Sequence, residues 1–510
     1  MASRRDELNA YTYAKKRLVA QFLQPSPTGT EEGAPRPLRA VVPGLIIGVV
    51  IMAGFGAWGL FKPKAPKGWD TAGAHVIVAS NSTTRYVVLN NPDKKQRELH
   101  PVLNYASAKL VLDPDKGEVV KVDEKVLDGG KIAHGATIGI PYAPDRLPEP
   151  GEAAGTKRWA VCERPGEGGS AIQKAAFVFA KRDMAKVEGE NRLHHGDLMY
   201  VQGPGPDKKQ YVVDKTGTAY EVKQDERLLR TLVGGEKPQR VSQQWLNTLH
   251  KGEKVFFPEV GGHVGDTAHA PGELDPDSDK VGTVLKATSG ATSQQYVVVK
   301  DRVLPVSDFM AKLLLNSPKE IRLGQNGHPK EVSAAEIQPA KEHFGGKQDW
   351  PQESPNPVNS ASLHKGKRNT VCNVLRHVSG KNHTTLSTWS GTHFPARLGA
   401  GSTSGYVTPG SGQLYRQVQG TDTKAGGVFL VTDTGLRYAM QSNSDSDRGG
   451  SGIGAGGKKQ QKQQQQESQQ AQTRLGYGDM RPAPIPAEWS QFLPTGPRLS
   501  TGSARQPQGS

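Results

Sequence analysis

The first 61 residues divide into a helical pattern, a proline-containing break and a long apolar run. Between Leu8 and Phe22 apolar residues recur near one helical face, whereas Lys15–Arg17 lie toward another. Pro25 ends this pattern. The spacing predicts an amphipathic helix that lies on anionic lipid, packs against a partner subunit, or is simply solvated.

The apolar run extends from Val41 to Phe61 and contains 21 residues without a charge, between Arg39 and Lys62. A helix of this length would span a hydrocarbon core of about 30 Å. A cleaved signal peptide has a shorter apolar stretch nearer the start, and no small-residue cleavage site follows Phe61. The density of glycine argues against a buried globular helix. We therefore predict a transmembrane helix over residues 40–61, with Val41 and Phe61 as its limits.

The charges that flank this segment predict its orientation. Residues 1–39 contain seven Lys and Arg residues against four acids, although Lys62, Lys64 and Lys67 weaken the asymmetry. The positive-inside rule places the short tail in the cytoplasm. We therefore expect a single-pass protein of the cell membrane with most of the chain outside the cytoplasm.

Beyond Phe61, short apolar runs recur in four similar groups. Their anchors are RYVVLNN at Arg85–Asn91, QYVVDK at Gln210–Lys215, QYVVVKD at Gln295–Asp301 and VFLVTDTG at Val428–Gly435. Each anchor lies between two other strand-like runs, and in the first three groups a helix-periodic stretch follows. We predict a β-rich α+β fold built from four small strand-strand-strand-helix repeats. One such unit buries little surface, so the repeats should dock on each other or on something else.

The uneven spacing of the anchors excludes a regular solenoid and predicts two pairs of repeats that flank a central module. The expected divisions are a cytoplasmic tail (1–39), the transmembrane helix (40–61), repeat 1 (62–115), the central domain in two parts (116–192 and 331–410), repeat 2 (193–255), repeat 3 (256–330) and repeat 4 (411–510). Within repeat 4, the Gly- and Gln-rich sequence at 441–470 cannot bury a core and predicts a disordered insertion.

Composition narrows the classes of partner. The 510 residues carry a net charge of +15, with 60 Gly, 36 Pro and 35% hydrophobic residues, which favours many turns over a compact helical enzyme. A basic protein can neighbour nucleic acid, anionic lipid headgroups or an anionic cell-wall polymer. No Lys- and Arg-dense stripe with interleaved aromatic residues occurs, and no zinc-finger or RNP-like spacing. We therefore expect no nucleic-acid partner.

Cys162 and Cys372 are the two cysteines of the chain. In a reducing cytosol both would be buried apolar residues, whereas outside it a lone pair favours one disulfide. The predicted orientation places both outside the cytoplasm, so we predict that they are joined. Such a bond would close the central domain across about 210 residues and stabilise it by up to about 5 kcal/mol.

One segment approximates a phosphate-binding loop. Gly452, Gly457 and Lys458 match G-x-x-x-x-G-K, but Lys459 stands where Ser or Thr should hold Mg²⁺. No hydrophobic strand precedes the segment, so a flexible loop is the alternative interpretation and the favoured one. The residues themselves imply no cofactor, and the catalytic residues stay unknown.

Other catalytic motifs are missing from the sequence, which contains no G-x-S-x-G, H-E-x-x-H or C-x-x-C. His194 and His195 are adjacent, so in a strand they would face opposite sides and could not hold one metal ion together. We expect them at a strand edge and predict no metal site.

Several separated features together resemble one family. These are the block ELNAYTYAKKRLVAQFL, the single predicted span, the YVV repeats, the cysteine pair and the segment LGYGDMRPAPIPAEW. The combination is similar to EccB, the membrane-anchored core subunit of the actinobacterial type VII (ESX) secretion system. The resemblance covers nearly the whole chain. It implies an elongated extracytoplasmic region of repeats around a disulfide-bearing central domain, with Cys162 and Cys372 at the matching positions.

The resemblance also implies partners and function. It implies an oligomer within a membrane complex that contains an EccC-type motor ATPase, EccD and EccE, and that exports small WXG100-type proteins. It adds peptidoglycan as a candidate partner and ATP as a candidate ligand. Two functions follow: a structural subunit that links the channel to the periplasm or cell wall, and, as the alternative, an extracytoplasmic ATPase. The missing catalytic residues favour the structural subunit.

Overall fold

The computed structural model describes residues 3–23, 38–61, 65–91, 93–166, 171–290, 292–364, 366–399, 404–440, 466 and 468–508. These residues divide into two compact units, Met1–Lys67 with Lys121–Lys131, and Gly68–Val120 with Ile132–Ser510. Most of the predicted insertion at 441–470 lies outside the described residues.

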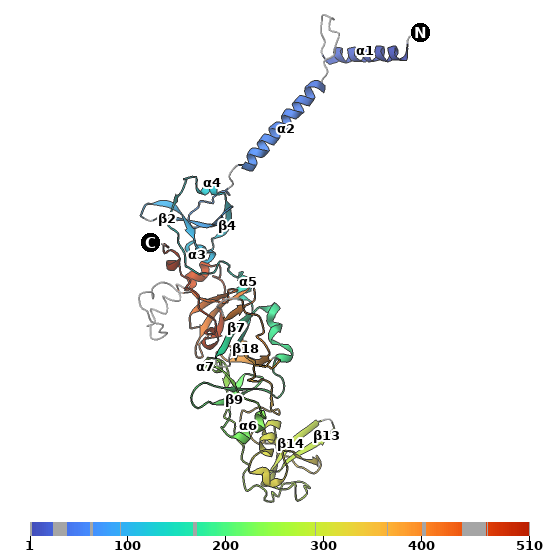
Figure 1. The fold of residues 1–510 in the computed structure, drawn as a ribbon, viewed down its shortest axis with the longest axis vertical. Helices are drawn as coiled ribbons and strands as arrows, with labels where there is room; N and C mark the ends of the chain where they lie inside the picture. Colours follow the sequence, from blue (N-terminus) through green and yellow to red (C-terminus); the bar gives the residue numbers. More distant parts are fainter. Residues whose placement is uncertain are drawn as a thin grey trace. The chain divides into compact units, whose positions relative to one another are not determined.

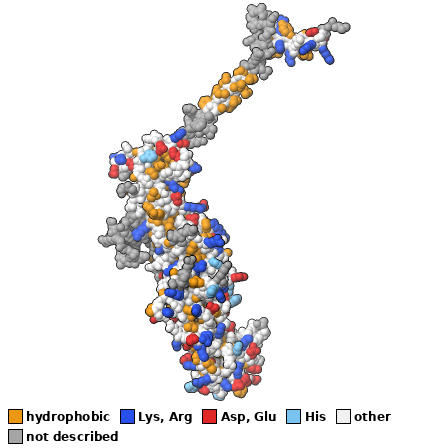
Figure 2. Space-filling view, viewed as in Figure 1, with side chains coloured by type: hydrophobic (Ala, Val, Ile, Leu, Met, Phe, Trp, Pro, Cys, Tyr) orange, Lys and Arg blue, Asp and Glu red, His pale blue; other side chains and the backbone are white. Residues whose placement is uncertain are grey.

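The first unit contains the two N-terminal helices, α1 (Arg4–Leu23) and α2 (Leu38–Phe61), and the short helix α4 (Glu124–Leu127). Along α1 the apolar side chains of Leu8, Leu18 and Phe22 are exposed. Figure 2 shows mostly hydrophobic side chains on the described part of α2. The side chain of Ile47 on this helix is exposed. Within the described residues, none of the helices combines the length and the apolarity that a membrane crossing requires.

The second unit is built mainly from five small sheets (Figure 1), so the β-rich α+β class predicted from the sequence is confirmed. Four of them contain three consecutive strands, and we call these the first to fourth meander sheets. The first has the order β4-β1-β2-β3-β5 and comprises β1 (His75–Ala79), β2 (Arg85–Asn91), β3 (Gln96–Val102), β4 (Glu118–Val122) and β5 (Ala133–His134). The second has the order β11-β8-β9-β10-β12, with β17 paired to β8, and comprises β8 (Asp197–Gln202), β9 (Gln210–Val213), β10 (Thr218–Glu221), β11 (Gln239–Arg240), β12 (His250–Lys251) and β17 (Asn356–Pro357).

Within the described residues, the third and fourth meander sheets have four strands each, and the fifth sheet has five. The third meander sheet has the order β15-β14-β13-β16 and comprises β13 (Val284–Ser289), β14 (Thr292–Val299), β15 (Arg302–Val306) and β16 (Lys330–Ser333). The fourth has the order β23-β22-β21-β24 and comprises β21 (Gly412–Val418), β22 (Val428–Thr432), β23 (Arg437–Ala439) and β24 (Ala483–Pro486). The fifth sheet, called the central sheet, has the order β19-β18-β6-β7-β20 and comprises β6 (Arg158–Pro165), β7 (Ile172–Phe179), β18 (Thr370–Val378), β19 (Thr384–Gly391) and β20 (Gly405–Val407).

Short helices connect these strands, and the sequence explains where three of them begin. They are α3 (Tyr105–Val111), α6 (Glu226–Val233) and α8 (Asp308–Leu315), each after the third strand of a meander sheet. Asn104, Asp225 and Ser307 cap them, because each side chain accepts a hydrogen bond from a backbone N–H in the first turn. Other short helices in the described residues include α5 (Pro150–Ala154), η1 (Lys181–Val187), η2 (Gly189–Asn191), α7 (Gln243–Leu246), η3 (Glu320–Leu323), α10 (Ala487–Ser490) and α11 (Thr501–Ala504).

The meander sheets contain more than the three strands predicted for each repeat. In three of them a later strand returns parallel to the first strand of the meander: β11 to β8, β16 to β13 and β24 to β21. These added strands have two to four residues. Segments so short carry no readable hydrophobic period, which is why the sequence did not reveal them. That the four meanders are copies of one repeat stays a prediction.

Shared cores join the sheets, and one of these cores joins two sheets that are far apart along the chain. Val87 of the first meander sheet and Leu430 of the fourth belong to one apolar core. Val212 of the second and Val297 of the third belong to another. A third core joins the central sheet to the second and fourth meander sheets, and in it Trp159 contacts Tyr415 with ring centroids 5.2 Å apart.

The structure contains a disulfide between Cys162 and Cys372 in the central sheet. Cys162 on β6 lies directly opposite Cys372 on the antiparallel strand β18, with their Cα atoms 4.0 Å apart and both side chains fully buried. The chain between them includes the second and third meander sheets. The bond therefore joins two neighbouring strands of the central sheet, one before and one after the second and third meander sheets in the sequence.

A buried acid next to the disulfide connects the central sheet to the second meander sheet. The Glu163 carboxylate accepts hydrogen bonds from the backbone N–H of Ser242, at 2.7 Å, and from its hydroxyl, while Ser242 caps α7. On α7, the Trp245 indole N–H donates to the Val161 carbonyl at 3.1 Å. Burial raises the pKa of Glu163, and the two bonds from Ser242 offset only part of this effect.

Removing the disulfide should destabilise the chain. We expect the double variant Cys162→Ala/Cys372→Ala to lose about 2–5 kcal/mol of unfolding free energy, because the unfolded chain regains the freedom of a 210-residue loop. Denaturant unfolding of the full chain in detergent, followed by tryptophan fluorescence, measures this loss. The wild type treated with reductant in denaturant is the control. An unchanged midpoint would contradict the role given to this bond.

Stability should also depend on pH through Glu163. Its pKa is higher in the folded than in the unfolded chain, so its contribution is full below the unfolded value and is lost as pH rises through the folded value. In Glu163→Gln this loss is absent, so as the pH rises above about 4 the unfolding free energy should fall less than in the wild type. Glu226→Gln, at an exposed position on α6, should leave the profile unchanged. Identical profiles for Glu163→Gln and wild type would refute this prediction.

Candidate functional site

A cleft of about 1170 Å³ lies beside the second and third meander sheets. Its walls come from the start of α6, the segment after β12, the end of α8 and the loop after β16. The lining residues are Lys223, Asp225, Leu228, Lys254, Phe256, Phe257, Pro258, Glu259, Met310, Ser317, Pro318, Lys319, Glu342, His343, Phe344, Gly345, Gly346, Lys347 and Gln348. The four segments are distant in sequence, so the cleft exists only in the folded chain.

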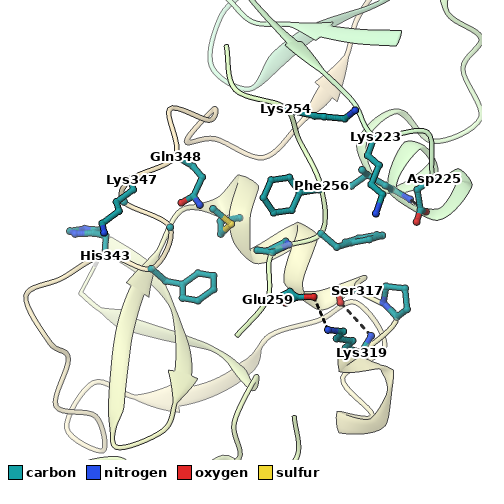
Figure 3. Close-up of a pocket in the computed structure, with 18 of the residues that line it drawn as sticks. Lys223, Asp225, Lys254, Phe256, Glu259, Ser317, Lys319, His343, Lys347 and Gln348 are labelled. Carbon is teal, nitrogen blue, oxygen red and sulfur yellow. Dashed lines mark hydrogen bonds and ion pairs between the residues drawn. The ribbon is translucent and has the colours of Figure 1, made fainter. Parts of the chain in front are cut away.

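Aromatic and apolar side chains line much of the cleft. Phe256 keeps 40% of its surface exposed and packs edge-on against the buried Trp350, with ring centroids 5.2 Å apart. In Figure 3 Phe256 lies between Lys347 and His343 on one side and Lys223 and Asp225 on the other. An exposed phenylalanine held in place by a buried ring is a surface on which a ligand can pack.

Two of the four lysines in the cleft are neutralised by acids. Lys319 contacts Glu259 at 2.7 Å, and this bond holds the pKa of Glu259 below its ordinary value (Figure 3). Lys254 contacts Glu221 at 2.9 Å, and this bond lowers the pKa of Glu221 in the same way. These exposed pairs fix the direction of the side chains more than they stabilise the fold.

The other two lysines, Lys223 and Lys347, form no ion pair within the described residues. Asp225 lines the cleft near Lys223, but its carboxylate is already the cap of α6, where it accepts from the Leu228 N–H at 3.0 Å. The cleft therefore offers two lysines outside ion pairs beside aromatic rings. This combination suits a ligand that carries both negative charge and an apolar group.

The loop that carries Lys347 depends on one glycine. Gly345 has φ +69°, and a Cβ there would lie 2.3 Å from the Met310 methyl group on α8. Glycine permits this backbone conformation and the close approach to α8. Lys347 is thereby held at the edge of the cleft.

The candidate residues from the sequence lie elsewhere. Gly452, Gly457 and Lys458 are outside the described residues, so the phosphate-binding interpretation of that segment stays untested. His194 and His195 lie in the turn before β8 rather than in a strand, and His195 has φ +44°. Over the described ranges, no group of three His, Cys, Asp or Glu side chains could hold a metal ion.

The cleft was not predicted from the sequence, although two of its segments share a recognisable pattern. KVFFPE at Lys254–Glu259 and HFGGK at His343–Lys347 each place phenylalanine beside lysine. Only the fold brings the two fragments together, since 83 residues separate Lys254–Glu259 from His343–Lys347.

Curated relatives are secretion-system proteins. The chain is 27% identical to the ESX-1 secretion system ATPase EccB1 of Mycolicibacterium smegmatis over 280 residues, which are 54% of this chain and 54% of that protein. It is 27% identical to the ESX-3 secretion system ATPase EccB3 of the same species over 436 residues, which are 80% of this chain and 76% of that protein. The chain thus spans about half the length of the first of these relatives.

Solved structures have the same fold. One is a chain in the structure of an intact ESX-5 inner membrane complex, with a TM-score of 0.54 and 18% identity over 100% of this chain and 96% of that one. Another is in the structure of the EccB3 dimer from the ESX-3 core complex, with a TM-score of 0.54 and 22% identity over 84% of this chain and 99% of that one.

A family model covers almost the entire sequence. The EccB model, described as type VII secretion system ESX-1, transport TM domain B, matches residues 1–509. Because the family model matches almost the whole chain, and a solved EccB3 structure has the same fold, the chain belongs to the EccB family of type VII secretion systems.

Proposed function

We propose that this protein is a structural core component of a type VII secretion membrane complex. In this role it links the channel to the periplasm or cell wall while small WXG100-type proteins are exported. Family membership carries the proposal, and the solved relative from an ESX-5 inner membrane complex supports it. Its partners would be the EccC-type motor ATPase, EccD and EccE, and the relative solved as a dimer favours an oligomer within the complex. Peptidoglycan is a further candidate partner.

The proposal includes a single transmembrane helix formed by residues 40–61. The 21 uncharged residues from Val41 to Phe61 support it, as does the helical conformation of α2. With the tail in the cytoplasm, the five sheets lie outside. The buried disulfide suits that location, because disulfides persist in oxidising compartments.

The exposed apolar side chains of α1 support a second contact, on the cytoplasmic side. Leu8, Tyr11, Leu18 and Phe22 are each at least 66% exposed. A helix with such a row of exposed apolar side chains has a reason to bind lipid or another subunit. We assign α1 to contact with the other membrane subunits of the complex.

Hydrolysis of ATP is the second candidate function. The curated relatives carry the name ATPase, and Lys223 and Lys347 in the cleft could contact phosphate oxygens. Phosphoryl transfer also needs a positioned metal and water. Among the described residues no three His, Cys, Asp or Glu side chains are grouped so that they could hold a metal ion, so we rank this function second.

The orientation can be tested with an impermeant thiol reagent. In intact cells the reagent should modify Thr71→Cys, at an exposed position after the span, and should spare Asn9→Cys in the tail. The native cysteines do not interfere, because they are buried in a disulfide. Labelling of both variants after membrane disruption is the control. The reverse pattern in intact cells would overturn the orientation.

The contact through α1 can be tested by a single charge. Phe22→Asp places a carboxylate on the apolar row and should reduce copurification of the chain with EccC-type, EccD and EccE subunits by about tenfold, which corresponds to about 1.4 kcal/mol. Ala10→Asp adds the same charge outside this row and should copurify like the wild type. An unchanged thermal unfolding midpoint would show that the rest of the fold is intact. Equal copurification of Phe22→Asp and wild type would refute the assigned contact.

A further inference from the structure

Three arginines gather around one carboxylate beside the central sheet, and none of them lines the cleft. Arg158 opens β6 and Arg376 lies on β18, which pairs with β6 through Leu375 and Trp159. Arg192 follows η2 and forms an isolated bridge with Trp389 of β19. The carboxylate is that of Glu188, between η1 and η2. We call Arg158, Arg192 and Arg376 the arginine cluster.

Two members of the arginine cluster share Glu188. The Arg376 guanidinium contacts both carboxylate oxygens, with Nη2 at 2.9 Å from Oε2 and Nη1 on Oε1. Its Nε donates to the Ser387 hydroxyl at 2.6 Å. Arg192 Nη1 lies 3.1 Å from Oε2 of the same carboxylate. Glu188 therefore forms ion pairs with two guanidinium groups.

Arg158 is left without a matching acid. Its Nε is buried, and in the described part of the chain no hydrogen-bond acceptor reaches it. Burial lowers the pKa of Arg158, and the nearby positive charge of Arg376 lowers it further. A buried donor without an acceptor is unfavourable, so an anion that accepts from Arg158 would stabilise the cluster.

The cluster is charged and partly open to solvent. Three guanidinium groups against one carboxylate leave two positive charges unmatched. The side chains of Arg192 and Glu188 are 39% and 30% exposed, so a ligand can reach them. The planar guanidinium fork matches the oxygens of phosphate and similar oxyanions.

We propose that Arg158, Arg192 and Arg376 form a binding site for a phosphate-type dianion, whose two negative charges match the two unpaired positive charges of the cluster. The group arrives either as free phosphate or as a phosphate monoester on a larger molecule. Binding at this site can be measured on the isolated chain, without the other subunits of a secretion complex.

The test is a titration of the full chain in detergent at constant ionic strength, with the thermal unfolding midpoint as readout. Inorganic phosphate should raise the midpoint in a saturable way, because a ligand that binds the folded state stabilises it. Glycerol 1-phosphate distinguishes the two sources: tighter binding of the ester favours a group on a larger molecule, and binding of phosphate alone favours the free ion. Acetate, a monoanion, should have no saturable effect, and equal saturation by acetate would overturn the dianion assignment.

Substitutions test whether phosphate binds at the arginine cluster. Arg158→Met keeps the Glu188–Arg376 pair and should weaken phosphate binding at least about tenfold, as expected for loss of a charge-assisted contact. Arg230→Met removes the same charge from an exposed position on α6 and should bind like the wild type. If Arg158→Met does not fold, Arg192→Met, at a more exposed position, should show the same weakening. No saturable phosphate effect in the wild type, or equal affinity in Arg192→Met and wild type, would overturn the proposal.

Discussion

The pairing of β6 with β18 is the interaction on which the second unit depends. These strands come from segments more than 200 residues apart, and the disulfide between Cys162 and Cys372 joins them at the middle of the central sheet. Both the second and third meander sheets lie within the enclosed loop. If the pairing were lost, the arginine cluster would lose its shape, because Arg158 lies on β6 and Arg376 on β18.

Around this strand pair, buried polar contacts and apolar cores contribute to the fold in different ways. The cores hold sheets together over wide areas, as with Val212 and Val297, but apolar packing has little directional preference. Direction comes from hydrogen bonds such as those from Ser242 to Glu163 and from Trp159 Nε1 to the Gln413 side chain at 2.7 Å. A buried polar group tolerates few alternative partners, so such bonds select one arrangement among several that the cores would allow.

Much of the local structure could be predicted because its signals are local. The YVV anchors gave the positions of β2, β9 and β14, and the cap residues before α3, α6 and α8 have recognisable side chains. The disulfide followed from the count of cysteines and the expected compartment. The two-residue strand β11 could not be found, because two residues have no period. The cleft and the arginine cluster could not be found either, since their members are separated along the chain and meet only in the folded structure.

The shared core of the first and fourth meander sheets has a consequence for biogenesis. Val87 belongs to the same apolar core as Leu430 and Leu499, so more than 300 residues must be made before this core can close. Long-range contacts of this kind form slowly and leave apolar surface uncovered in the meantime. If the chain crosses the membrane from its N-terminal side, the first meander sheet emerges early. Part of its apolar surface then stays uncovered until the fourth meander sheet has been made. A holding chaperone outside the cytoplasm would then be needed until residues near 499 arrive, and truncated chains that lack the fourth sheet would expose the first to proteases.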